Sequence, residues 1–312
     1  MPSSPPPFPC PTRLWHNKAQ PSTLPTRPEL SAKGKSVMVT GGGSTGIGGA
    51  TARHFAEAGA SRIALLGRRE KPLLDNKAFI ENAFPTVEVV TIPTDVTQKG
   101  EVDAAFGRFA AAGGGGEMID VLVHCAVFVG PKDAVADVDG QQFLETICAN
   151  VAGSLYVAQA FVRHAAPGAV AIDVNSWSAH SRLSDFYSAY GIAKTAVHKL
   201  WDTIAVANPG LSVFHTQPGS VRTELSVAAF GTESFKNAWT DDVSLPAAFN
   251  VWLASPEARF LKGKFVWCNW DVDELKAQSS EIEKGTLLDI GLFGWPFDKS
   301  SQGPWSLVTK TH

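Results

Sequence analysis

The sequence has no long apolar run. None of its segments reaches the ~18 consecutive apolar residues from which a membrane-spanning helix is recognised. Its first residues, Met1-Pro-Ser-Ser-Pro-Pro-Pro-Phe-Pro, have neither the charged start nor the apolar centre of a secretory signal peptide. We therefore expect a protein of the cytoplasm that has no contact with a membrane.

Cysteine is scarce, and the histidines form no metal-binding motif. The four cysteines (Cys10, Cys125, Cys148 and Cys268) are scattered without a C-x-x-C pair, and no H-E-x-x-H sequence occurs. This pattern argues against a disulfide framework and a zinc site, and it favours a reducing compartment. His198 and His215 are expected to be ordinary helix and strand residues, and we predict no metal.

The chain carries no excess of positive charge. Its net charge is −3 and its pI is about 6.2, so it offers no basic field to nucleic acids or to acidic membranes. Its 312 residues are 44% hydrophobic and 18% charged, which is enough apolar material for one large core. This composition fits an enzyme that acts on small molecules.

A glycine-rich turn follows the first apolar run. Ser36-Val-Met-Val-Thr40 has the character of a strand, Gly42-x-x-x-Gly46-x-Gly48 follows it, and a helical pattern runs on through Ala58. Glycines let the backbone approach a pyrophosphate, whose charge is stabilised by free N–H groups at the start of the helix. We predict cofactor contacts from Gly42, Ser44, Thr45, Gly46 and Ile47. The ordinary alternative is a flexible turn.

An arginine takes the position at which an acidic residue would select NAD. The second apolar run, Ser61-Arg-Ile-Ala-Leu-Leu66, ends in Gly67-Arg68-Arg69, about 20 residues beyond the glycines. An acid there would bind the ribose hydroxyls, whereas the guanidinium of Arg68 suits a 2′-phosphate. The sequence thus predicts NADP(H). The alternative is that Arg68 and Arg69 are a solvated surface pair.

A tyrosine and a lysine stand four residues apart in a helical pattern. In Phe186-Tyr-Ser-Ala-Tyr-Gly-Ile-Ala-Lys-Thr-Ala196, a helix would bring Tyr190 and Lys194 to one face. A neighbouring ammonium favours the phenolate form of a tyrosine, which allows proton transfer near neutral pH. By itself this spacing is common and indicates only a helix face, so its weight comes from the motifs around it.

Two serines follow a buried strand. Ala169-Val-Ala-Ile-Asp-Val174 is succeeded by Asn175-Ser176-Trp177-Ser178, where hydroxyls would lie at a strand's carboxyl end. Ser176 or Ser178 could donate a hydrogen bond to a substrate carbonyl oxygen, and we favour Ser176, 14 residues before Tyr190. Local hydrogen bonding in a turn is the alternative for either serine.

Residues from about Lys33 to Leu275 resemble the short-chain dehydrogenase/reductase family. The resemblance implies catalytic roles for Ser176, Tyr190 and Lys194 and a proton-relay role for Asn150. Cofactor contacts are implied for Asp95 and Val96, for Ala126, for Tyr190 and Lys194, and for Pro218, Gly219, Val221 and Thr223. The chain departs from the family in two places: its glycine turn is one residue longer than Thr-Gly-x-x-x-Gly-x-Gly, and His124-Cys-Ala-Val127 replaces Asn-Asn-Ala-Gly.

The order of elements predicts a single α/β fold. Strands expected near residues 36, 62, 87, 119, 169, 211 and 264 alternate with helical stretches, which indicates a doubly wound parallel sheet with helices on both faces. Seven strands fit the Rossmann-type fold of the family. We divide the chain into a proline-rich arm (1–32), an NADP-binding catalytic domain (33–275) and a C-terminal extension (276–312). The arm is expected to be disordered or to lie on the surface, pinned by Leu14, Trp15 and Leu30.

The segment from about 222 to 242 is expected to be a substrate lid. It contains Phe230, Phe235 and Trp239, and the tail adds Leu292, Phe293, Trp295 and Phe297, so a fairly large apolar or aromatic substrate is indicated. The same aromatic residues could instead pack the lid or an oligomer interface. The resemblance implies a homodimer or homotetramer. Further similarity, in the blocks around Trp15, Trp267 to Leu275 and Leu292 to Pro296, is to a fungal subgroup associated with secondary metabolism.

Together these features predict an NADP(H)-dependent oxidoreductase that interconverts a small-molecule carbonyl and an alcohol. Two alternatives stay open. One is an enzyme of the same fold without net redox chemistry, such as a cyclase, isomerase or dehydratase, because a fold does not fix a function. The other is a binding module that senses NADP(H).

Overall fold

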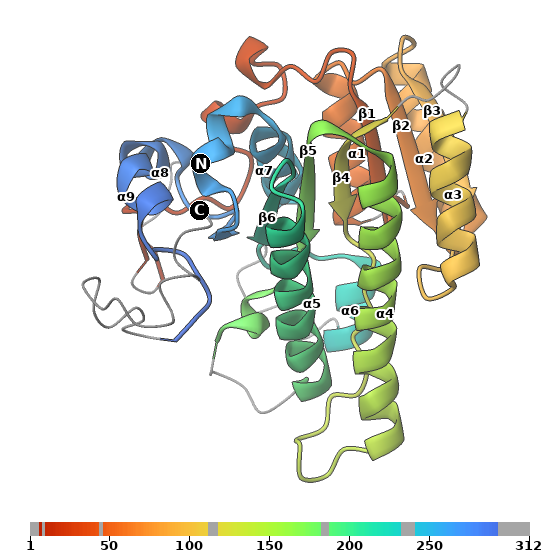
Figure 1. The fold of residues 1–312 in the computed structure, drawn as a ribbon, viewed down its shortest axis with the longest axis vertical. Coiled ribbons are helices and arrows are strands. Elements are labelled where there is room, and N and C mark those ends of the chain that lie inside the picture. Colours follow the sequence, from red (N-terminus) through yellow and green to blue (C-terminus); the bar gives the residue numbers. More distant parts are fainter. Residues whose placement is uncertain are drawn as a thin grey trace.

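The computed structural model describes residues 6–7, 10–43, 46–111, 118–181, 187–231 and 241–292. The predicted fold class is confirmed: seven parallel strands form one sheet in the order β3-β2-β1-β4-β5-β6-β7, with helices around it (Figure 1). The strands are β1 (Ser36–Thr40), β2 (Arg62–Gly67), β3 (Glu88–Pro93), β4 (Ile119–His124), β5 (Ala165–Val174), β6 (Ser212–Gln217) and β7 (Phe265–Trp267).

Helices cover both faces of the sheet. The α-helices are α1 (Ile47–Glu57), α2 (Glu70–Ala83), α3 (Lys99–Ala111), α4 (Gly140–His164), α5 (Ser188–Ala207), α6 (Glu224–Phe230), α7 (Ser244–Ala254), α8 (Val272–Ala277) and α9 (Ser279–Lys284). Short 3₁₀ helices are η1 (Pro21–Thr23), η2 (Pro28–Leu30), η3 (Trp177–Ala179) and η5 (Pro256–Leu261). Among the described residues, no helix is long and apolar enough to cross a membrane.

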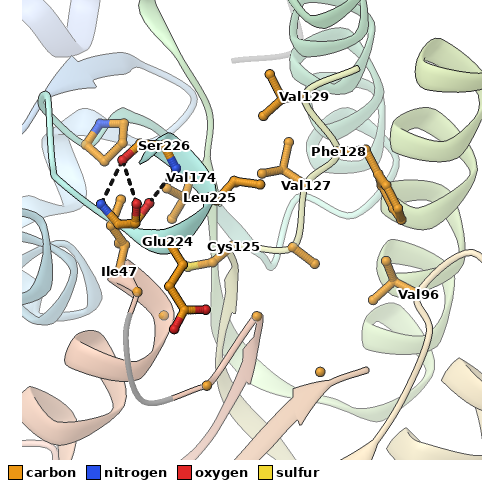
Figure 2. Close-up of a pocket in the computed structure, with 18 of the residues that line it drawn as sticks. Ile47, Val96, Cys125, Val127, Phe128, Val129, Val174, Glu224, Leu225 and Ser226 are labelled. Carbon is orange, nitrogen blue, oxygen red and sulfur yellow. Dashed lines mark hydrogen bonds between the residues drawn. The ribbon is translucent and has the colours of Figure 1, made fainter. Parts of the chain in front are cut away.

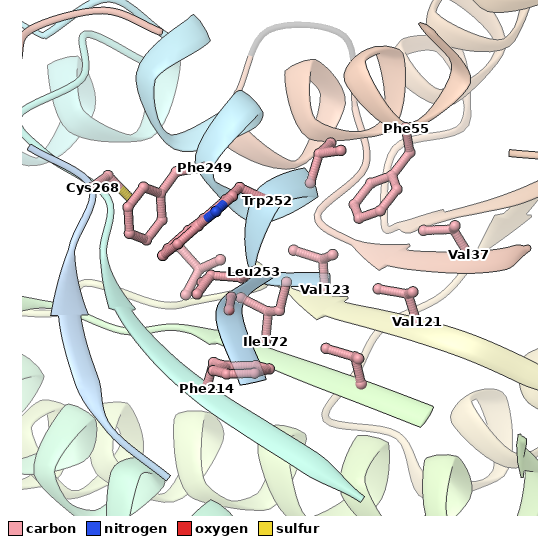
Figure 3. Close-up of a cluster of buried hydrophobic side chains, with 14 of the residues drawn as sticks. Val37, Phe55, Val121, Val123, Ile172, Phe214, Phe249, Trp252, Leu253 and Cys268 are labelled. Carbon is pink, nitrogen blue, oxygen red and sulfur yellow. The ribbon is translucent and has the colours of Figure 1, made fainter. Parts of the chain in front are cut away.

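Two apolar clusters hold the layers together. Helices α1, α2 and α7 pack on one face of the sheet, and α3, α4 and α5 pack on the other. Figure 3 shows Phe249 and Trp252 of α7 over Ile172 and Phe214 of the strands, and all four side chains are fully buried. Because both faces of the sheet are covered, side chains on both faces of the central strands are buried. In β1, all of Ser36–Thr40 is buried.

The chain order reverses at the centre of the sheet. Strand β1 pairs with β2 on one side and with β4 on the other, and the chain moves outward in both directions from there. In open α/β sheets this reversal separates the loops at the carboxyl ends of the two central strands and leaves a crevice that binds ligands. The fold therefore places a ligand site after Thr40 and His124.

The N-terminal arm belongs to the packed body. Trp15 is 6% exposed and Leu30 is 2% exposed, and both join the cluster that contains α1 and α7, whereas Leu14 remains 39% exposed. In Figure 1 the red arm runs along the β7 side of the molecule, and Trp15 forms an antiparallel bridge with Trp270. Of the three residues expected to pin the arm, two are buried.

Some boundaries differ from those expected. Strand β5 begins at Ala165, four residues before the predicted start, and its register against β4 shifts between Ile119 and Val121. The expected lid begins with the regular helix α6. The predictions for Phe235 and Trp239 and for the tail residues Phe293, Trp295 and Phe297 concern residues outside the described ranges, as does the position of the Phe230 side chain.

Candidate functional site

A cavity of about 730 Å³ lies at the carboxyl ends of the central strands. Figure 2 shows one wall formed by Val127, Phe128 and Val129 after β4, and the opposite wall formed by residues of α6. The predicted residues that line the cavity are Gly46, Ile47, Arg68, Asp95, Val96, Ala126, Tyr190, Lys194, Pro218, Gly219, Val221 and Thr223. The topology has thus brought segments from most of the chain to one site.

The tight turn after β1 depends on Gly41, and Gly42 lies outside the cavity lining. Gly41 has a φ of 67°, which favours glycine, and a Cβ at this position would lie 3.3 Å from the backbone nitrogen of Ala126. A Cβ at Gly42 would instead meet Leu65 at 3.2 Å. The sequence suggested Gly42 as the first glycine of the turn. Because the turn is one residue longer than in the family, Gly41 takes that position instead. Ser44 and Thr45 are outside the described residues.

The end of the turn is open where a ligand would approach. Gly46 precedes α1 as its N-cap residue, and a Cβ there would have no atom within 4 Å. At Gly48 a Cβ would lie 2.5 Å from the carbonyl oxygen of Gly41, so the first turn of α1 packs directly on the loop. This arrangement leaves the N-terminus of α1 facing the cavity, as binding of a pyrophosphate requires.

His124 ties the ends of β1 and β4 together. Thr40 Oγ1 accepts the N–H groups of Cys125 and Ala126, each at 3.1 Å. With both lone pairs used, the Thr40 hydroxyl donates to Nδ1 of His124 at 2.9 Å. His124 therefore carries its proton on Nε2 and donates it to Ser154 Oγ at 2.9 Å. Burial lowers the pKa of His124 to about 4, which keeps the ring neutral, as this network requires.

The departure from Asn-Asn-Ala-Gly is thus accommodated by the fold. His124 is 4% exposed and points away from the cavity, while Ala126 and Val127 line it. Cys125 also lines the cavity, and burial raises the pKa of its thiol to about 12. The thiol stays protonated at neutral pH, so Cys125 is not poised as a nucleophile.

Two arginines follow β2 at the edge of the cavity. Arg68 is exposed, and its guanidinium carbon lies 5.0 Å from the centre of the Phe128 ring. Arg69 donates from Nη2 to Glu224 Oε2 at 2.7 Å, which joins the end of β2 to the first residue of α6. The segment 67–69 contains no acidic residue, and Arg68 and Arg69 both line the cavity.

Asp95 and Val96 line the cavity after β3. The carboxylate of Asp95 accepts the backbone N–H and the hydroxyl of Thr97, at 2.9 and 2.8 Å. Val96 is 7% exposed and packs against α4, where a Cβ at Gly153 would lie 3.0 Å from its Cγ2. The turn is therefore held from both sides, and Val96 presents an apolar surface to the cavity (Figure 2).

Tyr190 and Lys194 lie one turn apart on α5 and both reach the cavity. Lys194 is 5% exposed and donates from Nζ to the carbonyl oxygen of Val174 at 2.7 Å. Its Nζ is 5.8 Å from the centre of the Tyr190 ring. An ammonium has three N–H donors, so two remain for other acceptors. The expected pair is thus assembled by the first turns of the helix.

Ser176 is close to this pair but does not line the cavity. It is 7% exposed, and its Oγ accepts the hydroxyl of Ser178 at 2.9 Å and the backbone N–H of Ser178 at 3.2 Å. With both lone pairs of Ser176 Oγ used, its own O–H is left to donate elsewhere. The hydroxyl of Ser176 therefore acts as a donor, and the two hydrogen bonds from Ser178 hold its Oγ in place.

Asn150 of α4 holds the wall of the cavity. Its Oδ1 accepts the N–H of Phe128 at 3.0 Å, and its Nδ2 donates to the carbonyl oxygens of Phe128 and Thr146 at 2.9 and 2.8 Å. The side chain thus uses its polar atoms on the backbone and does not line the cavity. The role that this geometry supports directly is positioning of Phe128.

The segment 218–223, from which cofactor contacts are predicted, leads into α6. Thr223 is the N-cap of this helix: its Oγ1 accepts the N–H of Ser226 at 3.0 Å, and Ser226 Oγ accepts the N–H of Thr223 at 2.7 Å. Figure 2 shows this reciprocal pair beside Leu225 and Val174. The capping box fixes Thr223 at the cavity with its own hydroxyl proton available to an acceptor.

A cluster of buried titratable side chains lies near Lys194. His215 of β6 is fully buried, with Nδ1 3.1 Å from Asp173 Oδ2 and Nε2 3.4 Å from Asp202 Oδ1. Burial opposes a charge on His215, but the hydrogen bonds with Asp173 and Asp202 outweigh it and raise its pKa. Burial also opposes a charge on Asp173, yet His215 and Lys194 outweigh it and lower its pKa to about 2.

This cluster connects to the cavity through Asn175. Asp173 Oδ2 accepts Nδ2 of Asn175 at 2.6 Å, and the same amide donates to the carbonyl oxygen of Lys194 at 3.2 Å. Asn175 lines the cavity, and its Oδ1 accepts the N–H of Ser176 at 2.8 Å. His215, which lies between the carboxylates of Asp173 and Asp202, is therefore connected through Asn175 to Ser176 and to the backbone of Lys194. The proximity of His198 (Nε2 3.5 Å from Asp202 Oδ2) completes the group.

Sequence reasoning missed several lining residues. Besides Gly41, they include the walls Val127 to Val129 and Glu224 to Ser226, together with Gly43, Gly67, Arg69, Pro72, Leu73, Cys125, Val174 and Asn175. Most flank a residue that was predicted, so neighbours in sequence were the available signal. The signal is weaker for Phe128 and Val129, because apolar residues after a strand also suit the core.

Known proteins resemble the chain over most of its length. The sequence profile of a family described as enoyl-(acyl carrier protein) reductase matches residues 42–269. Short chain dehydrogenase/reductase AacuD of Aspergillus aculeatus is 32% identical over 286 residues, which cover 90% of this chain and 96% of that protein. A short chain dehydrogenase/reductase of Claviceps purpurea is 33% identical over 291 residues, 91% of this chain and 95% of that one.

Solved structures resemble the fold. A short chain dehydrogenase from Burkholderia cenocepacia, determined in complex with NADP, superposes with a TM-score of 0.67 at 24% identity, over 78% of this chain and 99% of that one. The chain belongs to the short-chain dehydrogenase/reductase family, whose members are oxidoreductases that use a nicotinamide cofactor.

Proposed function

We propose that the protein is an NADP(H)-dependent oxidoreductase that interconverts a ketone or aldehyde with an alcohol, on a fairly large apolar or aromatic molecule of secondary metabolism. The observation that carries this proposal is one cavity with Tyr190 and Lys194 on α5 and with Arg68 after β2. The fungal relatives support the metabolic setting. A cytoplasmic location and a homodimeric or homotetrameric state stay predictions.

The residues present fit a dinucleotide that carries a 2′-phosphate. After β2, Arg68 offers its guanidinium to the 2′-phosphate. The open N-terminus of α1 at Gly46 suits the pyrophosphate, and Thr223 offers a hydroxyl at the opposite wall. Asp95 and Val96 would flank the adenine, and Ala126, Pro218, Gly219 and Val221 would border the rest of the cofactor. When bound, the cofactor supplies or accepts a hydride.

The protein's own residues would handle the proton and the developing charge. In the reductive direction, the Tyr190 hydroxyl donates a proton to the substrate oxygen, and the O–H of Ser176 stabilises the charge that grows there. The Lys194 ammonium, held by the Val174 carbonyl, has two further N–H groups for the ribose and for Tyr190. Oxidation of an alcohol follows the same path in reverse.

The test combines calorimetric titration of NADPH and NADH with an NADPH-consumption assay over aromatic and aliphatic ketones. Wild-type protein should bind NADPH more tightly than NADH, and Arg68→Ala should remove most of that preference, because the guanidinium is the partner proposed for the 2′-phosphate. An unchanged preference in Arg68→Ala would exclude this assignment.

Tyr190→Phe tests the chemical step in the same assay. Loss of the phenol should lower turnover by roughly 100-fold or more while NADPH still binds. Tyr187→Phe is the matched control, because it removes a tyrosine hydroxyl near the start of the same helix, bonded to the Ala229 carbonyl outside the cavity lining. Tight NADPH binding without turnover of any carbonyl would favour a binding module, and product formation without NADPH consumption would favour a non-redox enzyme.

A further inference from the structure

The carboxylate of Asp241 locks the segment Gly219–Val221, which borders the cavity. Asp241 is 8% exposed; its Oδ2 accepts the N–H of Ser220 at 2.7 Å, and its own N–H donates to the Ser220 carbonyl at 2.8 Å. A parallel bridge joins Val221 to Asp241. Gly219 has a φ of 87°, and a Cβ there would lie 2.5 Å from Asp241 Oδ2, so the lock requires glycine.

The other oxygen of this carboxylate is held by the N-terminal arm. Asn17 Nδ2 donates to Asp241 Oδ1 at 2.6 Å, and the Asp242 N–H donates to the Asn17 carbonyl at 2.7 Å. Ala19 adds a backbone hydrogen bond to Ser244 Oγ at 3.1 Å. Asp241 therefore bridges two segments more than 200 residues apart, with one oxygen for each.

The arm is itself fixed on the β7 side. The N–H of His16 donates to the Asn269 carbonyl at 2.9 Å, and the Asn269 amide donates back to the His16 carbonyl at 2.8 Å. The Gln20 side chain donates to the Trp270 carbonyl at 2.7 Å and accepts the Val272 N–H at 3.1 Å. Hydrogen bonds therefore hold the arm on both sides of Asn17, at His16 and at Gln20.

We propose that the N-terminal arm is a positioning element of the cofactor site, in which Asn17 acts through Asp241 to hold Gly219–Val221 against the nicotinamide end of the cavity. The inference rests on the proposed function. Helix α6 begins at Glu224, shortly after Val221, so the arm also supports the segment that leads into this helix. Asn17 touches neither cofactor nor substrate, and its effect passes through Asp241.

The test uses the full-length protein with Asn17→Ala and Asn17→Asp. The second variant keeps the side chain's size but sets a carboxylate against Asp241. Ser22→Ala is the matched control, because it removes another hydrogen bond from an arm side chain to a carboxylate, that of Asp273, away from Asp241. The first readout is amide hydrogen exchange of Ser220 in the protein without cofactor. The second is the binding of NADPH compared with that of 2′,5′-ADP, which contains only the adenosine end.

We expect faster exchange of the Ser220 amide, by about fivefold in Asn17→Ala and more in Asn17→Asp, because a charge-assisted hydrogen bond to its acceptor is lost. The dissociation constant of NADPH should rise by roughly three- to tenfold in Asn17→Ala, while that of 2′,5′-ADP should stay within about twofold. A general loss of stability would weaken both ligands equally, and Ser22→Ala should change neither.

Unchanged Ser220 exchange and unchanged NADPH binding in both Asn17 variants would overturn the inference. So would equal weakening of NADPH and 2′,5′-ADP, because it would assign Asn17 a merely structural role. If the wild-type protein bound neither ligand, the proposed function would fail, whereas the exchange of Ser220 would still report on the contact between the arm and Asp241.

Discussion

At the scale of single residues, a departure from the family sequence is tolerated when neighbouring groups satisfy the hydrogen bonds of the new side chain. His124 stands where the family has an asparagine, and the Thr40 hydroxyl connects it to the N–H groups of Cys125 and Ala126. The neutral imidazole has one donor and one acceptor, and the network uses both. This arrangement destabilises the folded protein at acidic pH, where an imidazole in water would take up a proton.

His124→Asn should make the protein less sensitive to acid. The folded-state pKa of His124 is lowered to about 4, below the ordinary value of 6.5, so the unfolded chain binds a proton first as the pH falls. Wild-type protein should therefore lose about 3 kcal/mol between pH 6.5 and pH 4 through this residue. His198, whose pKa is also lowered to about 4, adds a loss of the same sign in both proteins.

Urea unfolding of wild type and His124→Asn at several pH values measures this effect. The difference in unfolding free energy between the two proteins should change in favour of the variant as the pH falls through this window. Parallel curves from pH 6.5 to pH 4 would show that His124 is not held neutral in the folded protein.

At the scale of elements, α5 combines two functions on one face. Tyr190, Lys194, His198 and Asp202 follow one another at intervals of four residues, so each lies about one turn from the next. The first two reach the cavity, and the last two join His215 and Asp173. The spacing indicated the helix face, but only the pairing of β5 with β6, which sets Asp173 beside His215, assembles the ionic cluster.

The ion pair between Arg69 and Glu224 joins two elements across the cavity. Both residues line it, one after β2 and one at the start of α6, and their side chains are 70% and 56% exposed. Exposed ion pairs contribute about 0.2–1 kcal/mol. We expect Glu224→Gln to release NADPH about 1.5- to fivefold faster, because a contact that closes the cavity is weakened.

Stopped-flow measurement of NADPH dissociation provides the comparison. Asp75→Asn is the matched control, since it removes an exposed ion pair with Lys71 that lies within α2 alone, and its dissociation rate should equal that of wild type. If Glu224→Gln also released NADPH at the wild-type rate, the ion pair would have no part in retaining the cofactor.

At the scale of the whole molecule, the arm and the C-terminal part of the fold form one packed unit. Trp15 meets the edge of Trp267 at 6.0 Å between ring centres, and Trp267 stacks with Trp270 at 6.1 Å. Truncation of a buried tryptophan costs about 3–5 kcal/mol in a protein core. Trp15→Ala should therefore lower the free energy of unfolding by about 3 kcal/mol.

Denaturant unfolding tests this expectation, with Leu14→Ala as the control. Leu14 is the neighbouring residue and is 39% exposed, so its truncation should change the unfolding free energy by less than about 0.5 kcal/mol. If Trp15→Ala lowered the free energy of unfolding as little as Leu14→Ala, Trp15 would add nothing to the stability of the core.

The α/β class, the seven strands and the residue types of the proposed site can all be predicted from sequence patterns. Runs such as Ser36–Thr40 are apolar on both faces, the glycines follow at the first strand's end, and Tyr190 and Lys194 keep helical spacing. These are local signals, because the period of a strand or a helix and the conformational freedom of glycine act over a few residues. Arg68 and Lys194, which these signals singled out, line one cavity in the structure.

Contacts between distant residues, in contrast, are known only from the folded chain. The tertiary structure assigned the turn position to Gly41, since the approach of Ala126 leaves no room for a Cβ. It also joined Asn17 to Asp241 and His215 to Asp202. Such contacts link residues that share no sequence period, so their partners follow from strand order and from how segments pack. The physical reason is that hydrogen bonds and burial depend on distance in space, which a linear pattern does not encode beyond one element.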